Sequence, residues 1–335
     1  MKRKVEYVWM GNQDTYNDFY SKIRTLEMKK IDLGEIPKWN FDGSSTGQSI
    51  GEDTEVILKP VKIYTSKTKE DEIIVLCECY DSKGKPTVCN TRYQAEKIFE
   101  KYREHKPMYG LEQEYVIMKN NTPYGWTMKT YTDKQKYYCS HGNHMKGREF
   151  VNEHYNMCLD YNINICGINA EVTPSQWEFQ IGPSYGVDAA DDLIMARFLY
   201  QKISEQHNIN ISYHPKPIPG NWNGSGCHVN FSSDLIRNSN GIKYIHQCLS
   251  VLSQYHTQDL ILFGTDIHLR LTGHHETSNP NIFTYGIGTR HTSVRIPNET
   301  ASNLCGYFED RRPCSNIDPY IVTSTLLLRY IQSLQ

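Results

Sequence analysis

Two glutamates stand two positions apart in the run YGLEQEYVIM, which has the pattern of a β-strand. Leu111, Gln113 and Tyr115 alternate with Glu112 and Glu114. The period of two in a strand puts both glutamates on one face, about 7 Å apart at the backbone. Two carboxylates so placed can bind a cation, or they can be solvated side chains on an exposed face.

The run GINAEVTPSQWEFQIGP supplies a second acidic pair, in two strand-like stretches around a turn at Pro174 and Ser175. If these two residues form the loop, Glu171 lies opposite Glu178, with side chains about 5 Å apart. Like charges in that register destabilise a sheet, unless a divalent cation lies between them. Proline is unusual in a two-residue hairpin loop, so a looser turn stays open. The apolar residues that alternate with Glu178 indicate one well-buried side.

A histidine and a further glutamate extend this set. His228 lies in NGSGCHVNFS and Glu309 in GYFEDRRP, which makes five carboxylates and one imidazole. Carboxylate-rich sets favour hard cations such as Mg²⁺ or Mn²⁺ over zinc. Taken singly, each residue can also be a solvated glutamate or a hydrogen-bonded core histidine. The spacing is compatible with a site for two metal ions and specifies nothing finer.

A cationic set accompanies the acids. Arg270 lies in LRLTGHHETSNPN, Arg290 and Arg295 in TRHTSVRIP, and Arg311 and Arg312 in FEDRRP. The planar guanidinium group matches phosphate and carboxylate oxygens in a bidentate manner. Each arginine can instead be a surface residue or the partner of one of the 38 acidic residues.

Two glycine-rich segments carry weaker signals. PKPIPGNWNGSGCHVNF lacks the lysine and the spacing of a P-loop, and it lacks a GxGxxG pattern. Its glycines either let backbone amides approach a ligand or form turns. In WNFDGSSTGQ, Asp42 and Gly43 are first a turn signal, and a role for Asp42 as a chemical base is the second interpretation.

Composition restricts the class of protein. The 335 residues carry a net charge of −2, which gives no reason to expect nucleic acid or a membrane surface as partner. No apolar run reaches the roughly 18 residues of a spanning helix. The start, MKRKVEYVWM, is not followed by the apolar stretch of a signal peptide, so we expect a cytoplasmic protein. The ten cysteines are scattered, and we expect free, structural thiols.

The residues before about position 85 are strand-like, and IIVLCECYD reads as a buried strand before the turn DSKGKP. Helices are expected in TRYQAEKIFEKYREH with Thr91 as its cap, in DAADDLIMARFLYQKISEQ, and from Asp318 and Pro319 to the C-terminus. The segment 120–148 is expected to be loop. A domain boundary near residues 82–90 would separate residues 1–85 from 86–335.

Seven blocks in order resemble the signature segments of one family, the eukaryotic-type (type II) glutamine synthetases. They are WNFDGSSTGQS, GLEQEY, NAEVTPSQWEFQIGP, PKPIPGNWNGSGCHVNFS, RLTGHHETSN, SVRIP and GYFEDRRP. The resemblance runs from about residue 5 to the C-terminal helix. It implies an α+β fold: a small N-terminal β-grasp domain, then a larger α/β catalytic domain with a curved antiparallel sheet.

The resemblance also assigns roles. Glu114, Glu171 and Glu178 match the ligands of the metal that holds glutamate, and Glu112, His228 and Glu309 match those of the metal at the ATP phosphates. Arg290, Arg295 and Arg311 match the phosphate and nucleotide clamp, and Asn230, Ser232 and Tyr307 fall in blocks that line the nucleotide. Asn221, Trp222, Asn223, Gly224, Arg270 and Arg311 match positions for the amino-acid substrate. Asp42 matches the aspartate that takes a proton from ammonium, and Glu276 matches the flap glutamate that shields the intermediate.

The implied activity is ATP-dependent ligation of ammonia to the γ-carboxylate of glutamate through γ-glutamyl phosphate, with Mg²⁺ or Mn²⁺. A homodecamer of two pentameric rings is implied, with Asp42 supplied by the adjacent subunit. A glutamate–amine ligase for another amine and a non-catalytic structural relative are the alternatives. Compared with the family, the chain lacks the usual N-terminal lead, the segments near 131–149 and 259–272 are shortened, and Met108 and Asn298 replace a common tryptophan and arginine.

Overall fold

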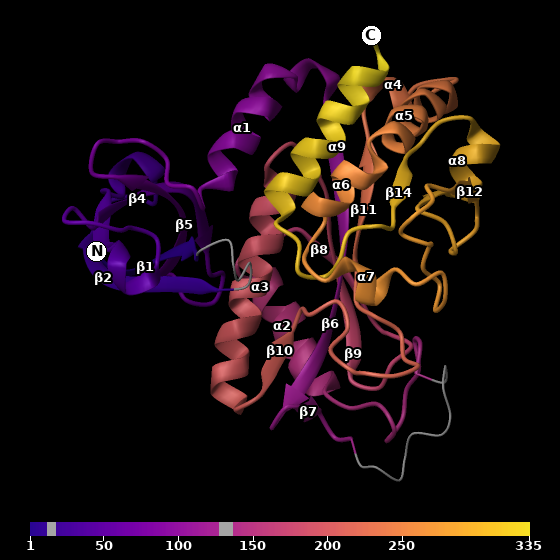
Figure 1. Ribbon diagram of the computed structural model, residues 1–335. Helices are drawn as coiled ribbons and strands as arrows, with labels where there is room; N and C mark the ends of the chain where they lie inside the picture. Colours follow the sequence, from indigo (N-terminus) through magenta and orange to yellow (C-terminus); the bar gives the residue numbers. More distant parts are fainter. Residues whose placement is uncertain (12–17, 127–136) are drawn as a thin grey trace.

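A computed structural model describes residues 1–11, 18–126 and 137–335, and Figure 1 shows its two β-sheets and the helices between and around them. The N-terminal sheet lies to one side, and the larger sheet runs through the centre of the remaining chain. This arrangement confirms the predicted α+β class. No helix in the described residues is long and apolar enough to span a membrane.

The first sheet contains five strands in the order β2-β1-β5-β4-β3, with β1 and β5 parallel and the other pairs antiparallel. Its strands are β1 (Lys2–Met10), β2 (Phe19–Glu27), β3 (Trp39–Asp42), β4 (Glu55–Thr65) and β5 (Glu72–Asp81). One face carries its own apolar cluster, which includes Val5, Tyr7 and Val75. The run IIVLCECYD is the buried strand β5, as predicted.

The opposite face of this sheet packs on the rest of the chain. Val8, Ile74 and Leu76 belong to the same apolar core as the helices of the larger part. Lys62 of β4 also contacts Asp188 and Asp192 of α3 at 2.9 and 3.0 Å. Figure 1 accordingly shows α3 between the two sheets. The small sheet is therefore attached by both apolar and charged contacts.

The second sheet has nine strands, and all of its pairs are antiparallel except the edge pair β12 and β13, which is parallel. That pair is the one departure from the expected antiparallel sheet. The strands are β6 (Met108–Lys119), β7 (Thr122–Pro123), β8 (Ile165–Ala170), β9 (Gln176–Tyr185), β10 (Asn210–Ser212), β11 (Cys227–Ser232), β12 (Tyr285–Ile287), β13 (Val294–Ile296) and β14 (Phe308–Asp310).

Nine α-helices occur in the described residues. They are α1 (Thr91–Lys101), α2 (Arg148–Asp160), α3 (Asp188–His207), α4 (Asp234–Arg237), α5 (Ile242–Gln254), α6 (His256–Leu262), α7 (Ile267–Arg270), α8 (Asn298–Asn303) and α9 (Pro319–Ser333). The predicted start of α9 is confirmed, because the Asp318 side chain accepts from two backbone N–H groups. The predicted cap of α1 is wrong by one residue: Asn90 accepts from Tyr93 N, while Thr91 donates to Asp318 at 2.6 Å.

The alternation along β6 separates the two faces of the second sheet. Tyr109, Leu111 and Tyr115 are fully buried in the core with residues of α3 and α9. Glu112 and Glu114 alternate with them and therefore lie on the opposite face. The predicted placement of both glutamates on one face is confirmed.

The predicted register around Pro174 is wrong. Glu178 pairs with Asn169, not with Glu171, and the residue directly opposite Glu178 on its other side is Glu114. Glu171 lies past the end of β8, in a loop where Ser175 has a φ of 59°. A two-residue hairpin loop needs a positive φ at its first position, which the ring of Pro174 forbids, so the loop is longer.

The part of the expected loop between residues 127 and 136 lies outside the described residues; the neighbouring residues contain only the two-residue strand β7 and turns before α2. All ten cysteines are free, as expected, and seven of them are buried. The first sheet ends at Asp81 and α1 begins at Thr91, which brackets the segment where a domain boundary is expected.

Candidate active site

The open face of the second sheet carries two rows of polar side chains that run across its central strands. In the first row His228 pairs with Glu112, and Glu112 pairs with Gln180. In the second row Glu114 pairs with Glu178, which pairs with Asn169 on β8. Side chains directly opposite in a sheet are about 5 Å apart, so the register alone concentrates these groups.

These rows form the floor of a cavity of about 570 Å³. It is lined by most of the residues that the sequence singled out, and by five others: Glu112, Glu114, Tyr138, Asn169, Glu171, Val172, Glu178, Gln180, Asn223, His228, His275, Glu276, Arg290, Arg295 and Arg311. Acidic strand residues and arginines from distant segments thus meet in one place, which we call the acidic pocket.

Two overlapping groups in the acidic pocket could hold a metal ion. Glu114, Glu171 and Glu178 each offer an oxygen within 4.8 Å of the others, and Glu112, Glu178 and His228 form a second such group. Glu178 belongs to both. The family resemblance assigned Glu178 to the first group only, and period and spacing do not show which residues face each other across strands.

The pKa values in this pocket indicate how strongly the acids affect one another. Loss of hydration and the nearby Glu114 raise the pKa of Glu171 to about 8. Burial followed by repulsion from Glu112 raises the pKa of Glu178 well above its usual value. Clustered carboxylates with little water ionise together only beside positive charge. An oxygen-rich set of this kind fits a divalent cation such as Mg²⁺ or Mn²⁺.

Glu114 is held in place by the glycine-rich loop before β11. The backbone N–H of Gly226 donates to its Oε2 at 2.7 Å. A Cβ at position 226 would lie 2.3 Å from a side-chain nitrogen of Arg270, so another residue there would displace the Arg270 guanidinium group. This contact gives the loop a physical role that its sequence left open.

His228 and Glu309 lie at the side of the pocket nearest the arginines. His228 Nδ1 is 3.3 Å from Glu112 Oε2 and 3.5 Å from Glu309 Oε1. Burial and the Arg311 guanidinium lower the pKa of His228 well below its usual value. A neutral imidazole beside carboxylates is the form that binds a metal ion. Glu309 is fully buried yet lies within reach of the same imidazole.

The arginines are tied to the acidic strands and loops. Arg311 Nη1 donates to Glu309 at 2.7 Å, and Arg295 contacts the same carboxylate. Arg311 also donates to the backbone oxygens of Arg290 and Glu276, at 3.2 and 3.3 Å. One side chain therefore fixes two loops that line the pocket.

A second cavity, of about 360 Å³, adjoins the first and shares Glu112 and Gln180 with it. Its lining includes Asn230, Ser232 and Tyr307, three residues that the sequence placed at a nucleotide. Asn230 Nδ2 donates to Glu112 Oε1 at 2.8 Å, which connects the two cavities. The pair has the form of a deep acidic pocket with an adjacent chamber.

Six of the expected site residues do not line either cavity: Asp42, Asn221, Trp222, Gly224, Arg270 and Glu309. Arg270 lies behind the acidic pocket, where Nη2 is 2.9 Å from His228 Nε2 and Nη1 donates to the carbonyl of Arg311 at 3.1 Å. Asn221, Trp222 and Gly224 precede β11, and of that segment Asn223 reaches the lining.

Asp42 lies on the N-terminal sheet, outside both cavities, at the end of β3. Its carboxylate accepts hydrogen bonds from Ser44 and Ser45, at 2.8 Å each. Bonds from Ser44, Thr54 and Ser45 lower the pKa of Asp42 to about 2. Asp42 is therefore an exposed, ionised acid, and within the described residues it does not reach the acidic pocket of its own chain.

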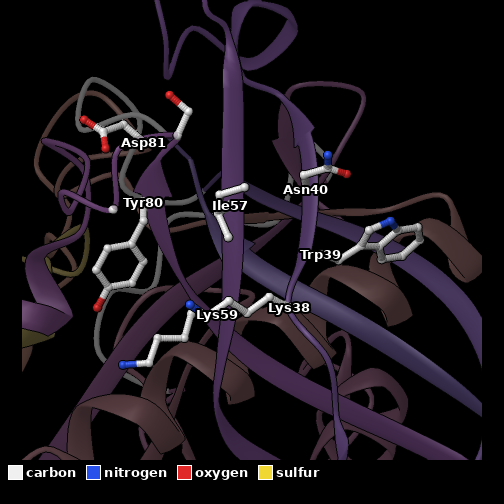
Figure 2. A pocket seen from close by; sticks show the side chains of 9 residues that line it. Lys38, Trp39, Asn40, Ile57, Lys59, Tyr80 and Asp81 are labelled. Carbon is white, nitrogen blue, oxygen red and sulfur yellow. The ribbon is translucent and has the colours of Figure 1, made fainter.

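A third cavity lies elsewhere, on the N-terminal sheet (Figure 2), with a volume of about 660 Å³. It is formed by Lys38, Trp39, Asn40, Ile57, Lys59, Tyr80, Asp81, Ser82 and Gly84. Asp81 is the one carboxylate among these described lining residues. The group lacks the clustered ligands of the acidic pocket, so we place the chemistry in the acidic pocket.

Several lining residues were not predicted from the sequence, among them Asn169, Gln180, Tyr138 and His275. For the first two a signal existed. Gln180 is two residues beyond Glu178 on β9, so it shares a face with that glutamate. Asn169 is opposite Glu178 on β8. Tyr138 and His275 come from loops, whose residues no periodic pattern predicts.

Clustered acids for a divalent cation, arginines beside them and an adjoining chamber define the class of metal-dependent enzymes that act on phosphate-bearing substrates. Comparison with known proteins identifies the member of that class. The family model "Glutamine synthetase, catalytic domain" matches residues 88–250. A glutamine synthetase of Saccharomyces cerevisiae is 44% identical over 326 residues, which cover 96% of this chain and 87% of the yeast protein.

A cytosolic glutamine synthetase isozyme (1-1) of rice is 45% identical, over 96% of this chain and 92% of its own. A Plasmodium falciparum glutamine synthetase structure shares the fold, with a TM-score of 0.78 at 17% identity, over 99% of this chain and 72% of that one. The chain belongs to the glutamine synthetase family, and it is a glutamate–ammonia ligase.

Proposed function

We propose that the acidic pocket is where this chain joins ammonia to the γ-carboxylate of glutamate at the expense of ATP. The observation that carries the proposal is the direct pairing of Glu114 with Glu178, two buried carboxylates in register. Such a pair is destabilising in an ordinary sheet. Its presence on the floor of an arginine-rimmed cavity is explained by a bound cation.

We propose two cation positions. Glu114, Glu171 and Glu178, which form one of the two groups above, would hold one ion. Glu112, His228 and Glu309 would hold the second, as the family resemblance implies, and the 3.5 Å between His228 Nδ1 and Glu309 Oε1 supports this set. A bound divalent cation neutralises the oxygens of glutamate and of the ATP phosphates, which lowers the barrier to phosphoryl transfer. We propose Mg²⁺ or Mn²⁺, because both prefer oxygen ligands.

The adjoining chamber is proposed to bind the nucleotide, through Asn230, Ser232 and Tyr307. Arg290, Arg295 and Arg311 would then lie between the nucleotide and the acidic pocket, where the γ-phosphoryl group must pass. Their guanidinium groups donate bidentate hydrogen bonds to phosphate oxygens. Glutamate is an unreactive acceptor until its γ-carboxylate becomes an acyl phosphate, with phosphate as the leaving group. Positioning and charge neutralisation by these side chains are the protein's main contribution.

The amino-acid part of glutamate is assigned to Asn221, Trp222, Asn223, Gly224 and Arg270, with Arg311 beside them. Ammonium becomes a nucleophile only after it loses a proton, and Asp42 is proposed to accept it. Glu276, from the loop held by Arg311, would close over the acyl phosphate and keep water from hydrolysing it.

For Asp42 to act, it must come from a neighbouring copy, and we therefore propose a homo-oligomer with active sites between subunits. Two stacked pentameric rings are the specific arrangement proposed. Residues 1–85 and 86–335 would be the two domains of each subunit. A cytoplasmic location is proposed too, and the rice relative named as a cytosolic isozyme supports it.

The test is phosphate release from ATP by the purified protein with Mg²⁺ and glutamate, with and without ammonium, while glutamine is quantified directly. We expect ammonium-dependent phosphate release with one glutamine formed per phosphate. Turnover with methylamine or hydroxylamine but not ammonium would favour a ligase for another amine. Absence of turnover with every amine would favour a structural relative.

A further inference from the structure

Two side-chain amides connect the carboxylates of Glu171 and Glu178. Asn169 Nδ2 donates to Glu171 Oε1 at 2.9 Å. Asn169 Oδ1 accepts from Gln180 Nε2 at 2.6 Å, and the same Nε2 donates to Glu178 Oε1. The chain of bonds runs from one acid to the other without a gap. We call Asn169 and Gln180 the amide pair.

The direction of each bond follows from chemistry. Ionised carboxylates only accept hydrogen bonds, whereas an amide group both donates and accepts. Each amide of the pair can therefore donate to one glutamate, and the two amides can also hydrogen-bond to each other. Two carboxylates could not contact each other in this way. Each glutamate has one oxygen that accepts from a neutral donor, which restricts rotation of its carboxyl group without adding a positive charge beside it.

The backbone is arranged to allow this contact. Gln180 pairs with Gly167 across β8 and β9, and a Cβ at position 167 would lie 2.2 Å from Gln180 Oε1. No side chain can occupy that position unless the amide moves, because real Cβ contacts do not approach so closely. Because Gly167 has no Cβ, the Gln180 side-chain amide can occupy the space above it.

We propose that Asn169 and Gln180 are positioning residues, which hold Glu171 and Glu178 in the geometry that binds a divalent cation. This inference rests on the cation site proposed above. The amide pair does not itself bind the cation; it orients two of the ligands that do. Loss of an outer partner of a metal ligand typically weakens metal binding by about 10- to 100-fold.

The experiment measures Mn²⁺ binding to the nucleotide-free protein by titration calorimetry, with electron paramagnetic resonance of unbound Mn²⁺ as a second readout. Asn169→Ala and Gln180→Ala are each expected to weaken Mn²⁺ binding about tenfold or more. The unfolding temperature of the metal-free variants is expected to stay near that of the wild type. Asn169→Asp places a carboxylate against Glu171 and should weaken binding at least as much.

Asn164→Ala is the matched control. Its side chain lies just before β8 and donates to Pro183 O at 3.1 Å and to Ser184 Oγ at 2.9 Å, away from the acids. This substitution removes a side-chain amide next to the same two strands and leaves the carboxylates and their hydrogen bonds in place. Mn²⁺ affinity should be unchanged in this variant.

Gly167→Ala provides an independent test, because it displaces the Gln180 amide without deleting it. It is expected to weaken Mn²⁺ binding about as much as Gln180→Ala does. In the double variant Gly167→Ala with Gln180→Ala, the loss of Mn²⁺ affinity should not exceed that of the larger single change, because both substitutions remove the same interaction. Additive losses in this pair would contradict the assigned role of Gly167 and of the amide beside it.

Failure of this inference is distinguishable from failure of the proposed function. If the wild type binds no Mn²⁺ and makes no glutamine, the cation site itself is wrong. If the wild type binds Mn²⁺ and the amide variants bind it equally well, the inference is wrong while the site stands. Weaker binding that only parallels a lower metal-free unfolding temperature would show a structural role and would also overturn the inference.

Discussion

Glu178 lies between a like charge and a neutral donor. Glu114 is directly opposite on β6, and Gln180 donates to it from the next position of its own face. Trp177 and Phe179, on the other face of β9, are fully buried and hold the strand in place. The packed side therefore fixes the backbone, while the polar side brings together charges that repel each other. That repulsion is the physical basis for two predictions.

The first prediction concerns the charge of Glu178. Glu178→Gln preserves shape but removes one ligand, so glutamine synthesis should fall by about 100-fold or more. The pKa of Glu178 is raised in the folded protein, so its ionisation destabilises that protein as the pH rises above the unfolded value. The metal-free variant should therefore be more stable than the metal-free wild type at pH 8, and by less at pH 5.

Thermal unfolding with a chelator present measures this difference, and Glu153→Gln is the control. Glu153 contacts His207 at the surface of α2 and is outside the pocket. Equal or lower stability of the metal-free Glu178→Gln protein at pH 8 would contradict the account of charge repulsion.

The second prediction concerns protons. Because the pKa of Glu171 is about 8, its carboxyl is mostly protonated in the metal-free protein at pH 7. A cation binds the ionised form, so binding at pH 7 should release a proton that is largely gone already at pH 9. Calorimetry of Mn²⁺ binding in buffers with different ionisation enthalpies counts the protons released. Glu171→Gln should release fewer at pH 7, and a release that does not change with pH would rule out this interpretation.

At the scale of elements, the features of a single strand or helix could be predicted from the sequence, whereas the pairing of β8 with β9 could not. Period two in β6 correctly placed Glu112 and Glu114 on one face, because that rule concerns a single strand. The predicted pairing of Glu171 with Glu178 was wrong, because register depends on the length of the turn. The prediction places only Pro174 and Ser175 in the loop, whereas the loop is longer than two residues. The helices α1, α3 and α9 were predicted from their caps and apolar patterns, although the cap of α1 was wrong by one residue. The helices α2 and α5 were not predicted.

The third prediction concerns an ion pair that joins two elements. Arg92 of α1 donates to Asp191 of α3 at 2.9 and 3.0 Å, and Tyr320 of α9 donates to the same carboxylate at 2.7 Å. Both charged side chains are buried. Asp191→Ala removes this shared acceptor, while Arg92 keeps its other contacts, which are with Glu78 and Glu96. The free energy of unfolding should therefore fall by about 1.5–3 kcal/mol, the usual contribution of a hydrogen bond to a charged group.

Urea unfolding followed by circular dichroism measures this loss. The matched control is Asp188→Ala on the same helix, whose exposed carboxylate pairs with Lys62. That surface pair should contribute about 0–1 kcal/mol. A similar loss in the two variants would show that burial of the Arg92–Asp191 pair does not decide its contribution.

At the scale of the whole molecule, the acidic pocket collects residues from β6, β8, β9, β11 and β13 and from loops that are far apart in sequence. Sequence periodicity cannot predict such contacts, because each depends on the order of strands in the sheet. The resemblance to a family supplied the set of residues that period and spacing left open. Asp42 belongs to the other sheet and does not join the pocket of its own chain.

The fourth prediction tests whether a neighbouring chain supplies Asp42. Asp42→Ala and Glu178→Gln subunits should each be inactive as homo-oligomers, because every site lacks either the base or a metal ligand. In a head-to-tail ring of mixed subunits, some sites combine the intact Asp42 of one chain with the intact pocket of the next. With equal amounts and random assembly, about a quarter of the sites should be complete. Glutamine formation by the co-expressed, co-purified variants measures that recovery. Mixing the two proteins after separate assembly is the control without exchange. If the co-assembled variants form no more glutamine than this control, each chain must complete its site alone or Asp42 has no part in the reaction.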